Sequence, residues 1–169
     1  DATSFNSDLS NWDVSMMTSL ELTFYGATSF TGDGMSDWDT SNLKALKGTF
    51  ADCISFNGDL SGWNTASVTN MYGTFAGTNS FTGDSIANWD TSRVTDLRYT
   101  FHDASSSFDP ENIHGWNVRS VIYCNNLFSE GDLTECEKKE LYDVWSYRSS
   151  AFASQYSTTW GSTTRECGC

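Results

Sequence analysis

Hydrophobic residues recur along most of the chain at an almost constant interval. Five tryptophans follow one another at steps of 26, 25, 26 and 27 residues, namely Trp12, Trp38, Trp63, Trp89 and Trp116. Phenylalanine stands twelve residues after each of them, at Phe24, Phe50, Phe75, Phe101 and Phe128. A second phenylalanine column precedes them, at Phe5, Phe30, Phe56, Phe81 and Phe108. A regular period of this size predicts stacked repeats whose aligned apolar columns form one continuous core.

The spacing inside one repeat predicts a strand followed by a short helix. Residues 60–65 match the L-x-x-L-x-L strand pattern of leucine-rich repeats. Val68, Met71 and Phe75 then follow at steps of three and four, which is typical of one helical face. We therefore expect an α/β repeat solenoid. It would be a right-handed, leucine-rich-repeat-like coil with a parallel β-sheet on one face and short helices or 3-10 turns on the other.

The pattern changes after Phe128. Thr134 and Glu137 have the spacing of a capping box, which predicts a helix over about residues 133–148. Solenoids need a cap to shield the last repeat. We accordingly expect two parts, with five repeats of about 25 residues over 1–128 and a C-terminal cap over 129–169 that holds a helix and a cysteine-bearing tail.

Two phrases of the repeat resemble a known family. They are Ser-Phe-Asn-x-Asp-Leu-Ser-x-Trp-Asp-Val-Ser at 4–15 and Ser-Phe-Asn-Gly-Asp-Leu-Ser-Gly-Trp-Asn-Thr at 55–65. Together with Val-Thr-Asn-Met at 68–71 followed by Phe75, they resemble the BspA-like leucine-rich-repeat surface proteins. The resemblance implies a secreted or cell-surface protein that adheres to other proteins or cells. It implies no enzymatic activity.

The charge balance narrows the class of partner. The chain has 22 acidic and 9 basic residues, for a net charge of −13. The absence of a basic stripe speaks against a nucleic acid partner, and no apolar run approaches the roughly 20 residues needed for membrane insertion. A basic protein, a cell-surface ligand or a second copy of the chain fits this charge. The alternative is that the acidic surface only keeps the protein soluble in a salty medium.

One polar column follows the tryptophans directly. We call this column, together with its polar neighbours on the other side of each tryptophan, the acidic strip. Its members are Asp13, Asp39, Asn64, Asp90, Asn117, Asn11, Asp37 and Asn88. The strip should point outward on the concave face of the predicted sheet. One hypothesis is a binding strip for a basic or hydroxyl-rich ligand. The other is that Asp and Asn bond local backbone amides and fix the turn.

Two further columns have alternative interpretations. Asp8, Asp33, Asp59 and Asp84 stand in Gly-Asp-type turn contexts, with Glu111 in the last repeat. A turn role is favoured over a calcium site, since calcium wants six or more oxygens, and we predict no metal and no cofactor. The threonine column, Thr23, Thr49, Thr74 and Thr100, is expected to be an exposed polar row, with ice binding as a minor alternative.

Five cysteines complete the candidate chemistry. Cys53 falls in a small-residue column and is expected to be a buried free thiol. We predict that Cys167 and Cys169 tie the tail to Cys124 and Cys136, although spacing does not fix connectivity. The alternatives are that all thiols are reduced, or that a zinc site forms, which the missing C-x₂-C spacing disfavours.

No catalytic motif emerges from the sequence. His102 and His114 fall in different columns, and neither a nucleophile elbow nor a metalloprotease or P-loop motif occurs. We therefore expect a protein that is not an enzyme, with extracellular adhesion or protein binding as its function. A structural subunit that assembles into a filament or coat through its open N-terminal edge is the alternative.

Overall fold

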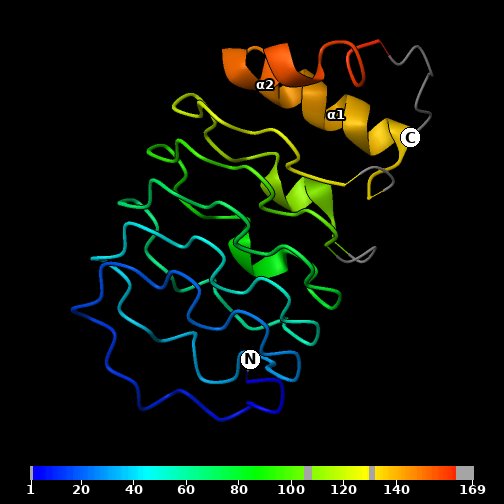
Figure 1. Ribbon diagram of the computed structural model, residues 1–169. Helices are drawn as coiled ribbons and strands as arrows, with labels where there is room; N and C mark the ends of the chain where they lie inside the picture. The colour runs from blue at the N-terminus through cyan, green and yellow to red at the C-terminus, as the bar shows by residue number, and fades with distance from the viewer. Residues whose placement is uncertain (1, 105–107, 130–131, 163–169) are drawn as a thin grey trace.

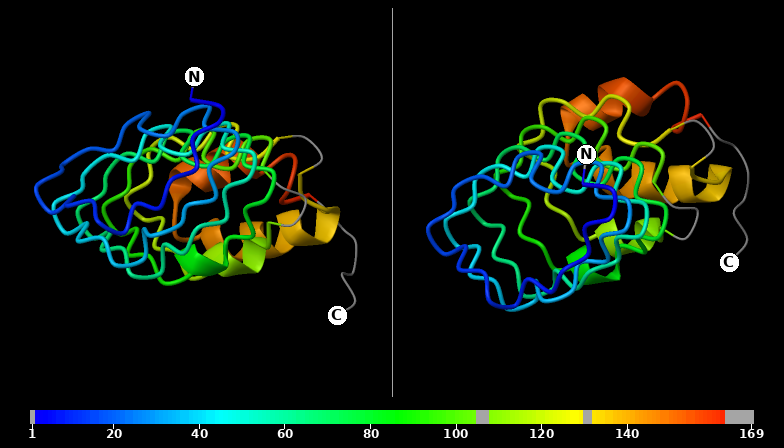
Figure 2. Two further views of the ribbon diagram at one scale, coloured as in Figure 1. Left: turned by 90° about the horizontal axis from the view of Figure 1, so that it is seen from below. Right: turned by 60° about the horizontal axis from the view of Figure 1, so that its bottom comes forward.

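The computed structural model describes residues 2–104, 108–129 and 132–162. The chain makes successive turns of similar shape, which stack on one another until two helices cover the last of them (Figures 1 and 2). We call each turn a winding and name it by its tryptophan. Backbone hydrogen bonds join equivalent positions of adjacent windings, for example from Gly48 N to Tyr72 O at 2.8 Å and from Gly73 N to Arg98 O at 2.9 Å.

The predicted parallel β-sheet is wrong. No strand occurs in the described ranges, where the β-type pairing between adjacent windings is limited to isolated parallel bridges. The main series of these bridges runs through Ser19, Ala45, Asn70, Asp96 and Tyr123. Each bridge lies seven residues after a tryptophan, on the stretch that was predicted to be helical. Bonds between residues three apart, such as Thr74 N to Met71 O at 3.2 Å, interrupt the extended chain before a strand can form.

The stretch predicted to be a strand is a turn. Trp63 N donates to Leu60 O at 3.0 Å, and the other four windings have the same bond. In two windings this turn tightens into a 3-10 helix, η1 (Asp84–Ile86) and η2 (Pro110–Ile113). Apolar residues three apart share a side in a turn, so the L-x-x-L spacing alone did not separate this turn from the predicted strand.

The aromatic columns form the core, as predicted, except that Trp12 in the first winding is 51% exposed. Trp38, Trp63, Trp89 and Trp116 are buried, and successive indole rings from Trp12 onward lie 5.9–6.3 Å apart. The rings of the Phe24 to Phe128 column follow at 5.4–5.8 Å. Indole N–H groups also bind the preceding winding, as Trp63 Nε1 does with Met35 O at 2.9 Å. The repeat therefore satisfies its buried polar groups between windings while it packs its rings.

The threonine column is not an exposed row. Thr49, Thr74 and Thr100 are fully buried, and only Thr23 in the first winding is exposed. The Thr74 hydroxyl lies 3.0 Å from Leu46 O and 2.8 Å from its own winding's Met71 O. Because these hydroxyls are used inside the stack, the row cannot present an ice-binding face.

Two helices cover the last winding. Helix α1 (Glu135–Trp145) begins with the predicted capping box, in which Thr134 accepts from Glu137 N and the Glu137 side chain accepts from Thr134 N. Helix α2 (Ser150–Tyr156) was not predicted. Trp145 lies on Trp116 at 6.4 Å and so continues the tryptophan column into the cap. None of the helices in the described ranges is long and apolar enough to span a membrane.

The cysteines agree with the predictions only in part. Cys53 is a buried free thiol, as expected, and its Sγ donates to Phe24 O at 2.9 Å. Cys124 is also free, so the predicted bridge to it is wrong, because it packs in the core in place of a Leu or Met. Burial raises the pKa of Cys53 to about 12 and that of Cys124 to about 11. Cys136 is disulfide-bonded, and Cys167 and Cys169 lie outside the described residues.

Candidate binding surface

The five Asp and Asn residues of the column after the tryptophans form one repeated turn. In each, the side-chain Oδ1 accepts a hydrogen bond from the backbone N–H two residues later, at 2.9–3.2 Å, as found for Asp13, Asp39, Asn64, Asp90 and Asn117. This confirms the hypothesis of local backbone bonding. The predicted placement on a concave sheet face is wrong, because no sheet is present at this surface.

The acidic strip is nevertheless one exposed row. All eight of its residues are exposed, including Asn11, Asp37 and Asn88 on the other side of the tryptophans. Each turn is closed through one side-chain oxygen, while the rest of the side chain lies at the surface. Because the windings stack in register, the turns bring carboxylates from distant parts of the sequence into one line.

Hydrogen bonds keep these carboxylates charged. The pKa of Asp13, Asp39 and Asp90 is lowered, first by the side-chain hydroxyl and then by the backbone N–H of the serine two residues later. The charge of Asp13 opposes this effect at Asp39, which shows that neighbouring carboxylates of the strip interact. These three carboxylates therefore hold their negative charge to a lower pH than ordinary aspartates do.

The second acidic column does not assemble a metal site. Asp8 and Asp59 each accept from the backbone N–H two residues later, at 2.9 Å, and Asp84 binds Thr82 and Asn112. No group of three or more His, Cys, Asp or Glu residues that could hold a metal occurs within the described residues. The turn role is thus confirmed for the two residues that close such turns, Asp8 and Asp59.

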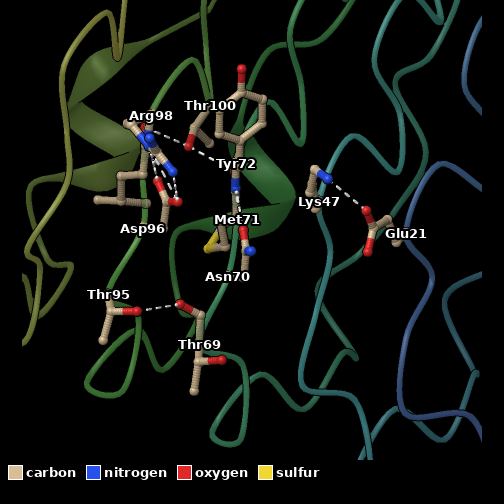
Figure 3. A network of polar contacts seen from close by, with 11 residues as sticks. Glu21, Lys47, Thr69, Asn70, Met71, Tyr72, Thr95, Asp96, Arg98 and Thr100 are labelled. Carbon is tan, nitrogen blue, oxygen red and sulfur yellow. Dashed lines mark hydrogen bonds and ion pairs between the residues drawn. The ribbon is translucent and has the colours of Figure 1, made fainter.

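A row of tyrosines with one arginine was missed by the sequence reasoning. The Arg98 guanidinium lies over the rings of Tyr72 at 5.2 Å and Tyr123 at 4.9 Å, and its Nη2 binds Asp96 Oδ2 at 2.7 Å (Figure 3). The Tyr72 and Tyr99 rings are 5.4 Å apart. These positions differ in residue type from one winding to the next, so they gave no column to detect. Their only signal was the number of tyrosines between 72 and 123.

Ser129, His102 and Asp103 meet beside the last winding. Ser129 Oγ donates to Asp103 Oδ1 at 2.5 Å and lies 3.0 Å from His102 Nδ1. In a catalytic triad the hydroxyl faces the imidazole, and the carboxylate orients that imidazole. Here the hydroxyl donates its hydrogen bond to the carboxylate instead, so the histidine is not placed as its general base.

Comparison with known proteins gives a family but no function. No curated protein and no solved structure matches the chain. A family model described as "Mycoplasma protein of unknown function, DUF285" matches residues 1–85 and again residues 59–153. Together the two matches cover all five windings, helix α1 and part of helix α2. The chain therefore belongs to the DUF285 family, whose function is unknown.

Proposed function

We propose that the protein is a secreted or cell-surface binding module whose acidic strip holds a basic protein or cell-surface ligand. The observation that carries the proposal is the row of Asx turns, which fixes exposed, ionised carboxylates in one line. The net charge of −13 favours a basic ligand. The resemblance of the repeat phrases to the BspA-like surface proteins supports adhesion as the role of the module and a location outside the cell.

A charge-neutral variant tests the strip without breaking its turns. Asn64 and Asn117 already close the same turn, so Asp13→Asn, Asp39→Asn and Asp90→Asn should keep the fold. The loss of three exposed charge contacts predicts roughly tenfold weaker binding of an oligolysine peptide at low salt. Titration calorimetry at two salt concentrations measures this loss, which should shrink as salt rises.

The matched control changes the same net charge elsewhere. The triple variant Asp8→Asn, Asp33→Asn and Asp59→Asn also raises the net charge from −13 to −10, since it removes three carboxylates. It should bind oligolysine nearly as well as the unchanged protein. Equal losses in the two triple variants would mean that total charge, and not the strip, sets the affinity.

A further inference from the structure

A hollow of about 240 Å³ lies on the outside of the stack, away from the acidic strip. Its floor contains Gly48 and Gly73, and its walls contain Leu22, Tyr25, Tyr72 and Tyr99. We call this hollow the tyrosine groove. A Cβ added to Gly73 would meet no atom within 4 Å, so the floor is open above that residue. The groove crosses several windings and is therefore elongated along the stack.

The backbone under the groove has a left-handed conformation that favours glycine, yet bulky residues occupy it in two windings. One column has positive φ in every winding, at Leu22 (56°), Gly48 (58°), Gly73 (59°), Tyr99 (57°) and Asn126 (54°). Left-handed backbone is unfavourable for a residue with a large side chain. Leu22 and Tyr99 both occupy it, and both are walls of the groove. Strain retained at a surface hollow points to a role for these side chains outside the fold.

We propose that the tyrosine groove binds a proline-rich segment of another protein in the polyproline II conformation. The backbone groups along this row are already used between windings, as in the bond from Leu22 N to Lys47 O at 2.9 Å. A ligand strand would therefore find no free edge to pair with. A polyproline II helix needs none, because it has no internal hydrogen bonds and docks its rings on aromatic walls.

The walls come from different windings, with Tyr25 in the Trp12 winding, Tyr72 in the Trp63 winding and Tyr99 in the Trp89 winding. They therefore follow one another along the stack. A polyproline II helix is itself elongated, with three residues and about 9.3 Å per turn, so a ligand that lies along the stack can meet more than one wall. The occupant is not a second copy of this chain, which has a single proline, Pro110, buried in η2.

The charges around the groove favour a segment with basic residues. Lys47 is paired with Glu21 at 2.7 Å (Figure 3), which leaves the exposed carboxylate of Asp52 at the groove. Arg98 already lies over the Tyr72 ring, so the tyrosines of this row accept a guanidinium. An arginine next to the prolines would combine both contacts.

The first test variant fills the floor of the tyrosine groove and leaves all its wall residues unchanged. Gly73→Asn puts a side chain into the open groove, and Asn126 shows that asparagine takes this backbone conformation in the same column. The probe is a fluorescent peptide of about twelve residues made of Arg-Pro-Pro units. Fluorescence anisotropy should show saturable binding to the unchanged protein. Binding to Gly73→Asn should be weaker by at least about tenfold.

A second variant and a second peptide complete the design. Tyr99→Gly removes a wall at a position that favours glycine, and it should also weaken binding about tenfold while the thermal midpoint changes little. At about 0.5 M salt, which screens the acidic strip, the Asn variant of the strip should bind the peptide as the unchanged protein does. Three results would each overturn the proposal: no binding of the proline peptide up to about 1 mM, equal binding of an Arg-Gly-Gly peptide, or unchanged affinity in both groove variants.

Discussion

Replacing Phe75 with alanine is expected to lower the free energy of unfolding by about 3–5 kcal/mol. Phe75 is fully buried, and its ring lies on Phe50 at 5.6 Å, Phe101 at 5.8 Å and Phe81 at 4.3 Å. The backbone bond from Phe75 N to Thr100 O holds the winding in place, so the cavity cannot collapse easily. Urea unfolding followed by tryptophan fluorescence measures the loss at an unchanged m value.

An exposed aromatic residue provides the control. Tyr147 is 78% exposed, and Tyr147→Ala should change the free energy of unfolding by no more than about 0.5 kcal/mol. A loss below about 1 kcal/mol for Phe75→Ala would be incompatible with a ring that is stacked on both sides.

Removing Trp145 is expected to have an effect of similar size, about 3–5 kcal/mol for Trp145→Ala. Trp145 is fully buried, lies on Trp116 at 6.4 Å and meets Phe152 edge-on at 5.3 Å. Its loss also uncovers the last winding, because α1 loses its main contact with the tryptophan column. Urea unfolding measures the cost, and amide exchange should show faster exchange in the Trp116 winding.

The indole nitrogens sharpen this prediction. Trp116 Nε1 donates to Ile86 O at 3.1 Å, whereas Trp145 Nε1 is buried without a hydrogen-bond partner among the described residues. Trp116→Phe therefore removes one of the two hydrogen bonds at Ile86 O, which also accepts from Trp89 N at 3.1 Å, while Trp145→Phe removes a buried donor that has no partner among the described residues. We expect Trp116→Phe to be the more destabilising by about 1 kcal/mol. The reverse order would contradict the hydrogen-bond assignment.

The sequence predicted the core because register does not depend on secondary structure. Any chain that returns to the same height every 25 to 27 residues brings Trp38, Trp63 and Trp89 together, whether the intervening backbone is strand or turn. The capping box at Thr134 could also be predicted, because its two partners are only three residues apart in the sequence.

The local backbone was not predictable by the same means. Leu60 and Trp63 were assigned to a strand because they match the L-x-x-L-x-L pattern, but the same step of three residues is also made by the turn that joins them. Thr74 was expected outside because it is polar, but its hydroxyl is satisfied by two carbonyls inside the stack. A buried hydroxyl of this kind depends on a neighbouring winding and is not encoded locally.

The candidate surfaces differ in how well they could be foreseen. The acidic strip has Asp or Asn directly after the tryptophan in every winding, so the column was visible and its turn role was among the hypotheses. The tyrosine groove is built from different residues in each winding, such as Leu22, Gly48 and Tyr99, and becomes a feature only when the windings are stacked. Surfaces of repeat proteins that vary between copies therefore need the structure before they can be recognised.

The most direct test of the stacked arrangement is a nuclear Overhauser spectrum of protein in which only the tryptophans carry protons. The account predicts contacts in sequence order along the column, from Trp12 through Trp38, Trp63, Trp89 and Trp116 to Trp145, because neighbouring rings lie 5.9–6.4 Å apart. Missing contacts between these neighbours, or contacts that skip a tryptophan, would contradict the stacking of successive windings.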